Sequence, residues 1–178
     1  MKFKNLDIEG VILVENFSSV DDRGIFVKTY SEDFFAGVEK ELIFKESYYS
    51  ISKKDVIRGM HFQKPPYDHH KLIHVLNGEI LDVIVDLREH SPTFGQYLSL
   101  KLSALENGLL IPKGCAHGFK ALVDNTAVVY NVTSCYNKES DSGIRWDSFG
   151  LDWDCVNPII SLRDRSFPKL SEFETCFE

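Results

Sequence analysis

The sequence has no long hydrophobic run, no closely spaced cysteine pair and no excess of positive charge. Its longest apolar stretches, such as residues 109–111, are far too short to cross a bilayer, and residues 1–10 carry scattered charges instead of the apolar block of a signal peptide. With 178 residues, 43% of them hydrophobic, and only 11 glycines and 6 prolines, the chain is neither disordered nor fibrous. These features predict one globular domain, residues 1–178, in the cytoplasm and without a membrane partner.

Cysteine spacing and net charge exclude two further classes. The four cysteines lie about twenty residues apart without any C-x-x-C pair, which excludes a zinc ribbon or a redox motif and predicts reduced thiols. The net charge of −7 at pH 7 argues against a nucleic-acid partner, because affinity for a duplex comes largely from a basic surface.

Short β-like runs separated by turns predict a β-sandwich or barrel. The runs are residues 11–17, 25–30, 43–52, 72–76, 79–87, 97–103 and 127–133. In residues 97–103 a strict period of two places Leu98, Leu100 and Leu102 on one face, which is typical of a strand with one core face.

Two local patterns give more specific predictions. Asn77-Gly78 lies between two β-like runs and is typical of a two-residue type I′ hairpin. Residues 32–41 form the one convincing amphipathic helix near the start, with Ser31 as N-cap and Phe34, Phe35 and Val38 on the packing side.

Histidine is the first candidate for chemistry, because its ordinary pKa of about 6.5 suits a general base near neutral pH. Five of the six histidines fall in two segments, residues 58–74 and 111–119. The second segment has the form P-x-G-x-x-H, in which Pro112 and Gly114 are expected to shape a turn that aims His117 into a small barrel. For any single histidine, a purely structural hydrogen bond remains the alternative.

Several motifs then occur in a fixed order along the chain. They are DRGIF at residues 22–26, RGMHFQ at 58–63, KL at 71–72, DVIVDLR at 82–88, SPTFG at 91–95, IPKGCAHGF at 111–119, IRW at 144–146 and SLRDR at 161–165. This ordered set resembles the dTDP-4-dehydrorhamnose 3,5-epimerase family, a metal-independent branch of the cupins, over about residues 10–168. The resemblance implies a homodimeric, mainly β, cupin-type antiparallel jelly roll with a few short helices and no cofactor. It also implies inversion of carbon 3, carbon 5 or both in a nucleotide-linked 4-keto-6-deoxy sugar.

Inversion of a carbon next to a ketone needs a base, a group that stabilises the enolate oxygen and a proton donor on the opposite face. The resemblance implies that His61 is the base and that Asp164 orients it, as the acid does in a catalytic triad. It implies that Lys71 is the cation near the ketone oxygen and that Tyr130 is the phenol that returns the proton. Without the motifs, Lys71 would be interpreted as a solvated lysine and Tyr130 as a core aromatic.

The same resemblance implies a set of residues that contact the substrate. Arg58 is expected at the sugar and pyrophosphate, and Arg23 at a phosphate across the dimer interface, because a guanidinium can meet phosphate oxygens bidentately. Phe26 and Tyr136 are expected to stack on the nucleotide base, and His117 to lie near the sugar. The remaining expected contact residues are Lys28, Glu46, Tyr48 and Gln63.

The chain departs from the family pattern at several of these positions. Lys28 stands where Glu is usual, Glu46-Ser47-Tyr48 replaces a Gln-Asp-Asn run, and His69-His70 replaces Gln-Gly. The nucleotide therefore stays open among dTDP, CDP and GDP. Gln63 stands where a metal-binding cupin has its second histidine, so no metal is expected. A single-carbon epimerase, a 3,4-ketoisomerase, a non-catalytic sugar-nucleotide-binding cupin and a metal-dependent cupin remain the alternatives.

Overall fold

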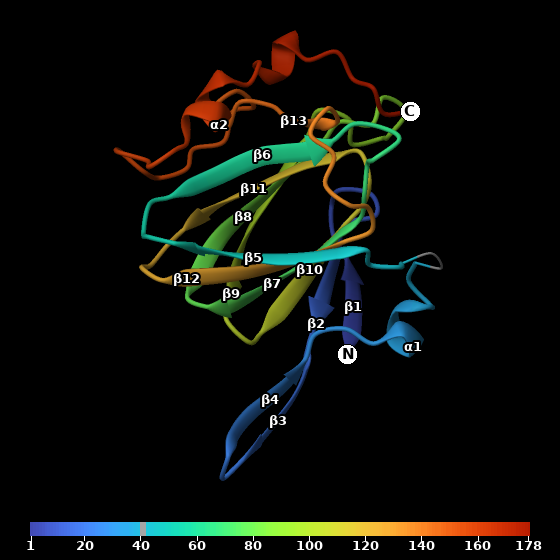
Figure 1. Cartoon of the computed structure of the whole chain (residues 1–178), viewed down its shortest axis with the longest axis vertical. Coiled ribbons are helices and arrows are strands. Elements are labelled where there is room, and N and C mark those ends of the chain that lie inside the picture. Colours follow the sequence, from blue (N-terminus) through green and yellow to red (C-terminus); the bar gives the residue numbers. More distant parts are fainter. Residues whose placement is uncertain (40–41) are drawn as a thin grey trace.

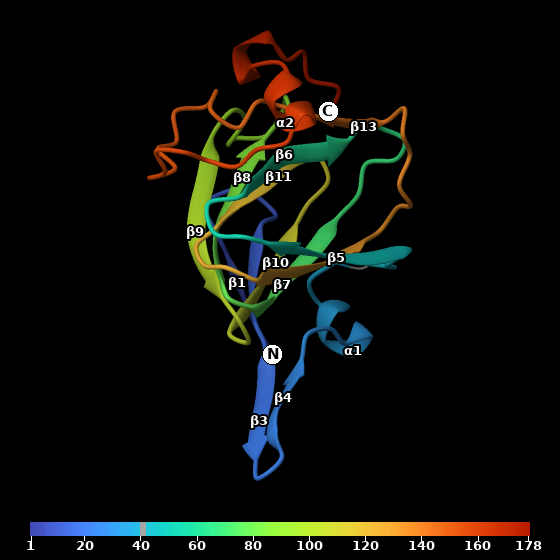
Figure 2. The same ribbon diagram turned by 60° about the vertical axis from the view of Figure 1, so that its left-hand side comes forward.

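The protein is described by a computed structural model over residues 1–39 and 42–178. Two β-sheets pack face to face, and a small two-stranded hairpin projects from one end (Figures 1 and 2). The six-stranded sheet has the order β1 (Lys2–Asn5), β2 (Ile12–Glu15), β10 (Asn107–Ile111), β7 (Lys71–Asn77), β12 (Thr126–Val132) and β5 (Glu46–Ser52). The five-stranded sheet has the order β13 (Asp141–Gly143), β6 (Ile57–Gln63), β11 (Cys115–Ala121), β8 (Glu79–Asp86) and β9 (Tyr97–Ser103).

All strand pairings within these sheets are antiparallel. The projecting hairpin consists of β3 (Phe17–Asp21) and β4 (Gly24–Lys28). The helices are short: α1 (Glu32–Phe35), α2 (Leu162–Ser166) and the 3₁₀ turn η1 (Leu170–Glu172). The predicted mainly β, cupin-type sandwich with a few short helices is confirmed. Within the described ranges, no helix is long and apolar enough to cross a membrane.

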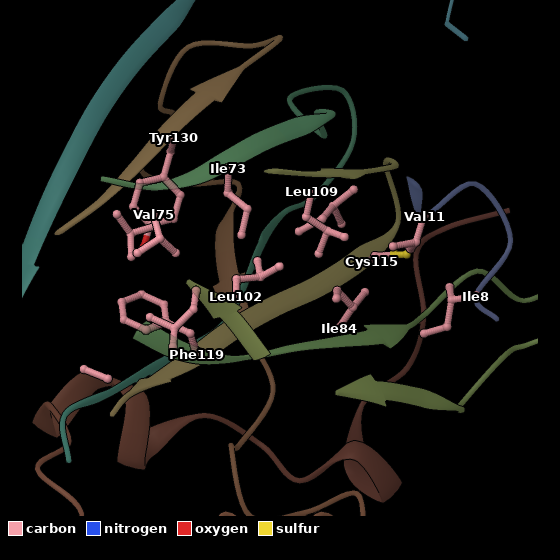
Figure 3. Close-up of a cluster of buried hydrophobic side chains, with 14 residues drawn as sticks. Ile8, Val11, Ile73, Val75, Ile84, Leu102, Leu109, Cys115, Phe119 and Tyr130 are labelled. Atoms are coloured by element: carbon pink, nitrogen blue, oxygen red, sulfur yellow. The ribbon is translucent and has the colours of Figure 1, made fainter. Parts of the chain in front are cut away.

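The main core lies between the two sheets, where inward-facing side chains of both meet. Ile73 and Val75 of β7 face Ile84 of β8 and Phe119 of β11, and Tyr130 lies at one end of the cluster (Figure 3). In β9, Leu102 is buried and the other two leucines are partly buried against the same cluster, as the period of two predicts. The four cysteines are free thiols.

The predicted Asn77-Gly78 hairpin is wrong. β7 and β8 belong to different sheets, so the chain crosses here from one sheet to the other instead of turning back on itself. Only Gly78 of the pair has a positive φ, of 82°. A Cβ on Gly78 would lie 2.5 Å from the Thr126 side-chain oxygen, so this glycine allows a close approach of two segments.

The helix predicted over residues 32–41 is also too long. α1 ends at Phe35 and is followed by a turn at residues 36–38, while residues 40 and 41 lie outside the described residues. Ser31 occupies the N-cap position, but its side chain makes no capping hydrogen bond. Phe35 is buried as predicted, whereas Phe34 is 48% exposed. Consecutive residues of a helix point about 100° apart, so α1 turns the ring of Phe35 to the core and that of Phe34 away from it.

Candidate active site

A histidine and an aspartate from distant parts of the chain form the centre of the site. His61 on β6 and Asp164 on α2 are joined by a 2.8 Å hydrogen bond between His61 Nε2 and Asp164 Oδ1. The carboxylate accepts, so Nε2 carries the proton and the lone pair of the imidazole is on Nδ1. Burial lowers the pKa of His61 below its ordinary value, although Asp164 acts in the opposite direction. His61 is thus a neutral, oriented imidazole near neutral pH.

The local structure around Asp164 holds this carboxylate in place. Its backbone N–H donates to the Ser161 hydroxyl, which caps α2, and its Oδ2 accepts a 3.2 Å hydrogen bond from Gly59 N. Gly59 has a φ of 143°, and a Cβ there would lie 2.5 Å from Gly118 Cα. Glycine at 59 therefore lets β6 approach β11 closely. Burial raises the pKa of Asp164, but hydrogen bonds with His61, with the backbone N–H of Gly59 and with the Ser161 side chain hold it below its usual range overall.

Lys71, the first residue of β7, lies beside the base. Its side chain is buried and donates a 2.9 Å hydrogen bond from Nζ to the backbone carbonyl of His61. Burial lowers the pKa of Lys71 to about 8, against the opposing effect of Asp141. The ammonium group is therefore a fixed positive charge near neutral pH, one of its three donors being used by the protein.

Two tyrosines form the wall opposite His61. Tyr130 on β12 and Tyr48 on β5 are directly paired across the antiparallel strands, and their rings stack with centroids 4.9 Å apart and an angle of 18° between the planes. The Tyr130 hydroxyl lies 3.5 Å from the Ser50 side-chain oxygen. Burial raises the pKa of Tyr130 far above its ordinary value, so the phenol stays protonated.

A second histidine–aspartate pair lies on the same side of the site as His61. His117 on β11 is directly opposite His61 in the strand pairing, and its Nε2 is 2.7 Å from Asp82 Oδ1 on β8. Both side chains are buried. The predicted inward aim of His117 after the turn at residues 112–114 is confirmed. Because Asp82 occupies Nε2, only the Nδ1 edge of His117 is left for a ligand.

These groups line two adjoining cavities that share Tyr48, His61 and Lys71. The inner cavity, of about 250 Å³, is also lined by Ser50, Arg58, His117, Phe119 and Tyr130. The outer cavity, of about 320 Å³, is also lined by Glu46, Phe62, Gln63, His69, Val132, Tyr136, Asp141 and Arg163. Nine of the thirteen predicted site residues line these cavities, and a tenth, Asp164, joins the site through its hydrogen bond to His61. Together the two cavities have the size and the mixed polar and apolar lining that are typical of a small-molecule site.

The other three predicted site residues do not line these cavities. Arg23, Phe26 and Lys28 all lie on the projecting β3–β4 hairpin and are exposed. Arg23 is paired with Asp21 on the same hairpin, through contacts as short as 2.5 Å. Within one chain, these residues are separate from the site.

Three polar residues at the outer cavity are not among the predicted site residues. Asp141 of β13 accepts a 2.6 Å hydrogen bond from Arg163 and a 3.3 Å hydrogen bond from the Tyr136 hydroxyl. Arg163 also lies over the ring of Phe167, 5.1 Å from its centroid. His69 is 3.0 Å from the Ser134 hydroxyl, and burial lowers its pKa to about 3. In the sequence, two features point to these residues. Arg163 is next to Asp164, and His69 lies close to the KL motif at residues 71–72.

Among the described residues, no three His, Cys, Asp or Glu side chains gather closely enough to hold a metal ion.

Comparison with known proteins identifies the family. The family model for dTDP-4-dehydrorhamnose 3,5-epimerase matches residues 5–172. The chain belongs to this family. A family relative named dTDP-4-dehydrorhamnose 3,5-epimerase, from Methanothermobacter thermautotrophicus, is 40% identical over 96% of this chain and 95% of its own.

Solved structures of epimerases share the fold. The dTDP-4-dehydrorhamnose 3,5-epimerase from Bacillus anthracis, crystallised with TDP and PPi, superposes with a TM-score of 0.91 at 40% identity and covers 95% of this chain and 99% of its own. A 3′-monoepimerase from Streptomyces bikiniensis, in complex with dTDP-quinovose, has a TM-score of 0.89 at 26% identity and covers 94% of this chain and 87% of its own. The chain is thus similar both to a 3,5-epimerase and to a single-carbon epimerase.

Proposed function

We propose that the protein is an epimerase that inverts carbons 3 and 5 of a dTDP-linked 4-keto-6-deoxy sugar. The observation that carries this proposal is the arrangement of one cavity, in which His61 faces Tyr130 and Lys71 lies beside the base. These are the base, the proton donor on the opposite face and the cation that the reaction requires. Family membership supports the same reaction class.

In the proposed mechanism, His61 Nδ1 removes the proton from the carbon next to the ketone. The electron pair moves to the ketone oxygen, where the Lys71 ammonium stabilises the enolate. Asp164 stabilises the imidazolium that forms, through the hydrogen bond at Nε2. The electron pair then returns to the carbon, which takes the proton of Tyr130 from the opposite face. Solvent reprotonates the phenolate and takes up the proton of the His61 imidazolium. Arg58 and His117 are placed to hold the sugar in the inner cavity.

The proposed enzyme is a homodimer whose site is completed by the partner. The outer face of the six-stranded sheet exposes large apolar side chains, among them Tyr49 (70%), Ile51 (59%) and Leu76 (51%). Several exposed large apolar side chains on one face of a sheet are typical of an interaction site. The outer cavity also carries two carboxylates, Glu46 and Asp141, beside its cations. Extra positive charge for a diphosphate would therefore come from the projecting hairpin of a second copy.

In this arrangement, the diphosphate and nucleotide are contacted by Arg23 and Lys28 of the partner subunit. The nucleotide base is stacked by Phe26 of the partner subunit and by Tyr136 of the first subunit. Gln63 supports the cavity wall, because its amide donates to Tyr67 O and its Oε1 accepts from Asn137 N. We place the reaction in the cytoplasm, where the four free thiols would stay reduced.

The test is turnover of 4-keto-6-deoxy sugars linked to dTDP, CDP or GDP, with the product stereochemistry assigned by NMR. The proposal expects inversion at carbons 3 and 5 with the dTDP sugar as the best substrate. Inversion with a higher kcat/KM on the CDP or GDP sugar would overturn the nucleotide assignment alone. Binding of all three without turnover would overturn the enzymatic proposal in favour of a sugar-nucleotide-binding protein.

A further inference from the structure

Tyr48 has no part in the mechanism given above, yet its side chain lies where the two cavities of the site meet. It is one of three residues, with His61 and Lys71, that line both the inner and the outer cavity. Its ring stacks on that of the proposed proton donor Tyr130. We infer that Tyr48 is a second catalytic proton donor, which serves one of the two inverted carbons while Tyr130 serves the other.

The placement of the two phenols carries this inference. β5 and β12 belong to the six-stranded sheet, whereas β6, which carries His61, belongs to the five-stranded sheet. Tyr48 and Tyr130 are directly opposite each other in the β5–β12 register, so both face the base across the cavity. A donor for an inverted carbon must approach from the face opposite the base. Two side-by-side donors therefore stand on the wall where the reaction needs them.

The geometry of the reaction also offers a place for a second donor. Carbons 3 and 5 flank the ketone carbon, so a ketone held at Lys71 places one of them on each side of that cation. The phenol of Tyr130 is buried and has little room to move, so it faces one of these carbons. A neighbouring phenol, with its ring centroid 4.9 Å away, faces the other without requiring the sugar to turn over. His61 then serves both carbons from the opposite wall.

The remaining polar groups of the inner cavity are less suited to this role. Asp82 already holds the Nε2 edge of His117, which lies on the same sheet as the base. Ser50 lies within 3.5 Å of the Tyr130 hydroxyl and is a weaker acid than a phenol. Burial, together with Glu46 and Asp141, raises the pKa of Tyr48 to about 12, so its phenol is protonated and able to donate.

Each step balances without any further reactant. One C–H bond breaks as its proton passes to His61 Nδ1 and its electron pair moves to the C4 oxygen. The electron pair then returns to carbon, which takes the proton of the Tyr48 O–H group and leaves a phenolate. Tyr48 is 43% exposed, so solvent can reprotonate the phenolate while the imidazolium releases its proton to solvent. No group is oxidised or reduced.

The inference rests on the proposed epimerase function. Product stereochemistry in D₂O distinguishes a failure of the inference from a failure of the proposed function. Wild-type protein is compared with Tyr48→Phe, Tyr130→Phe and the control Tyr97→Phe, using the dTDP-linked 4-keto-6-deoxy sugar. Tyr97 lies outside the site and is 41% exposed, close to the exposure of Tyr48. We expect Tyr48→Phe to accumulate sugar inverted at one carbon, with formation of the doubly inverted product slowed about 100-fold. Tyr130→Phe should stop inversion at the other carbon, and Tyr97→Phe should match wild type.

Deuterium incorporation gives the second readout. In Tyr48→Phe, His61 still removes and returns protons at both carbons, so deuterium should enter both with inversion at only one. Equal slowing of inversion at both carbons would assign Tyr48 a packing role against Tyr130 and overturn the inference. Double inversion within twofold of the wild-type rate, or wild-type protein that inverts only one carbon, would also overturn it. Absence of any turnover by wild type would instead refute the proposed function itself.

Discussion

Lys71 donates a 2.9 Å hydrogen bond to the backbone carbonyl of His61, so the proposed cation is held by the residue that supplies the proposed base. β6 and β7 lie in different sheets, and this bond links the two across the cavity. The relative position of base and cation is therefore fixed by the fold before a ligand arrives. Such preorganisation is what allows a fixed charge to stabilise an enolate at little cost.

A pH dependence follows from these two groups. The base must be neutral, and the pKa of His61 lies below its ordinary value, so kcat/KM should fall only as the pH drops below about 6.5. Lys71 must be charged and has a pKa of about 8, so kcat/KM should also fall as the pH rises through that value. In Lys71→Arg the charge persists at high pH, so the basic decline should disappear even though the maximal rate is lower. An unchanged basic decline in this variant would show that another group titrates.

Replacing Asp164 with Asn should leave the fold intact and remove most of the activity. An Asn amide placed at Nε2 would donate a hydrogen bond, which forces the His61 proton onto Nδ1 and eliminates the lone pair that accepts the substrate proton. We expect kcat to fall by about 10²–10⁴ with a small change in KM. The exposed Asp147, which pairs with Arg145, provides the control Asp147→Asn. Near-normal kcat in Asp164→Asn would contradict the role of the pair.

Completion of the site across a dimer predicts complementation between two inactive variants. His61→Ala lacks the base, and Arg23→Ala lacks the hairpin cation. When equal amounts are unfolded together and refolded, about half of the dimers are mixed, and one of their two sites combines an intact base with an intact hairpin.

The mixture should therefore recover about a quarter of the wild-type site activity, measured at a substrate concentration where each variant alone is nearly inactive. Activity equal to the average of the two variants would place Arg23 in the site of its own chain or outside any site. Light scattering on the same samples checks that both variants form dimers.

The close approach of β6 and β11 predicts a strong effect on stability. A Cβ on Gly59 would lie 2.5 Å from Gly118 Cα at a backbone φ of 143°, and the nearest atoms that it meets are all backbone. Gly59→Ala should lower the free energy of unfolding by more than about 2 kcal/mol, measured by urea denaturation. Gly37→Ala, at a position with nothing within 4 Å, should change it by less than about 0.5 kcal/mol. Equal effects of the two substitutions would contradict the close packing at Gly59.

Local patterns in the sequence predict the β class and the core face of β9, because alternation reports burial directly. They do not predict that the chain crosses from one sheet to the other at Gly78. A glycine with a positive φ is compatible with such a crossing as well as with a hairpin turn. β6 was not among the predicted strands, because its Arg58, Gly59 and His61 face a cavity or a close contact instead of an apolar core.

The site itself depends on contacts between distant parts of the chain. His61 and Asp164 are 103 residues apart, and only the ordered motifs, not any periodicity, indicated that they meet. Asp141 and Arg163 lie 22 residues apart, and although Arg163 belongs to the SLRDR motif, Asp141 belongs to none of the ordered motifs. Contacts of this kind are set by the fold as a whole, so local sequence patterns do not predict them.

The central claim is that His61 removes a proton from a carbon next to the ketone. It is tested most directly by NMR of the dTDP-linked 4-keto-6-deoxy sugar in D₂O, with wild-type protein compared with His61→Ala. The account predicts deuterium at carbons 3 and 5 with wild type, and a loss of at least about 100-fold in both exchange rates with His61→Ala. Exchange that continues at the wild-type rate in His61→Ala would contradict it.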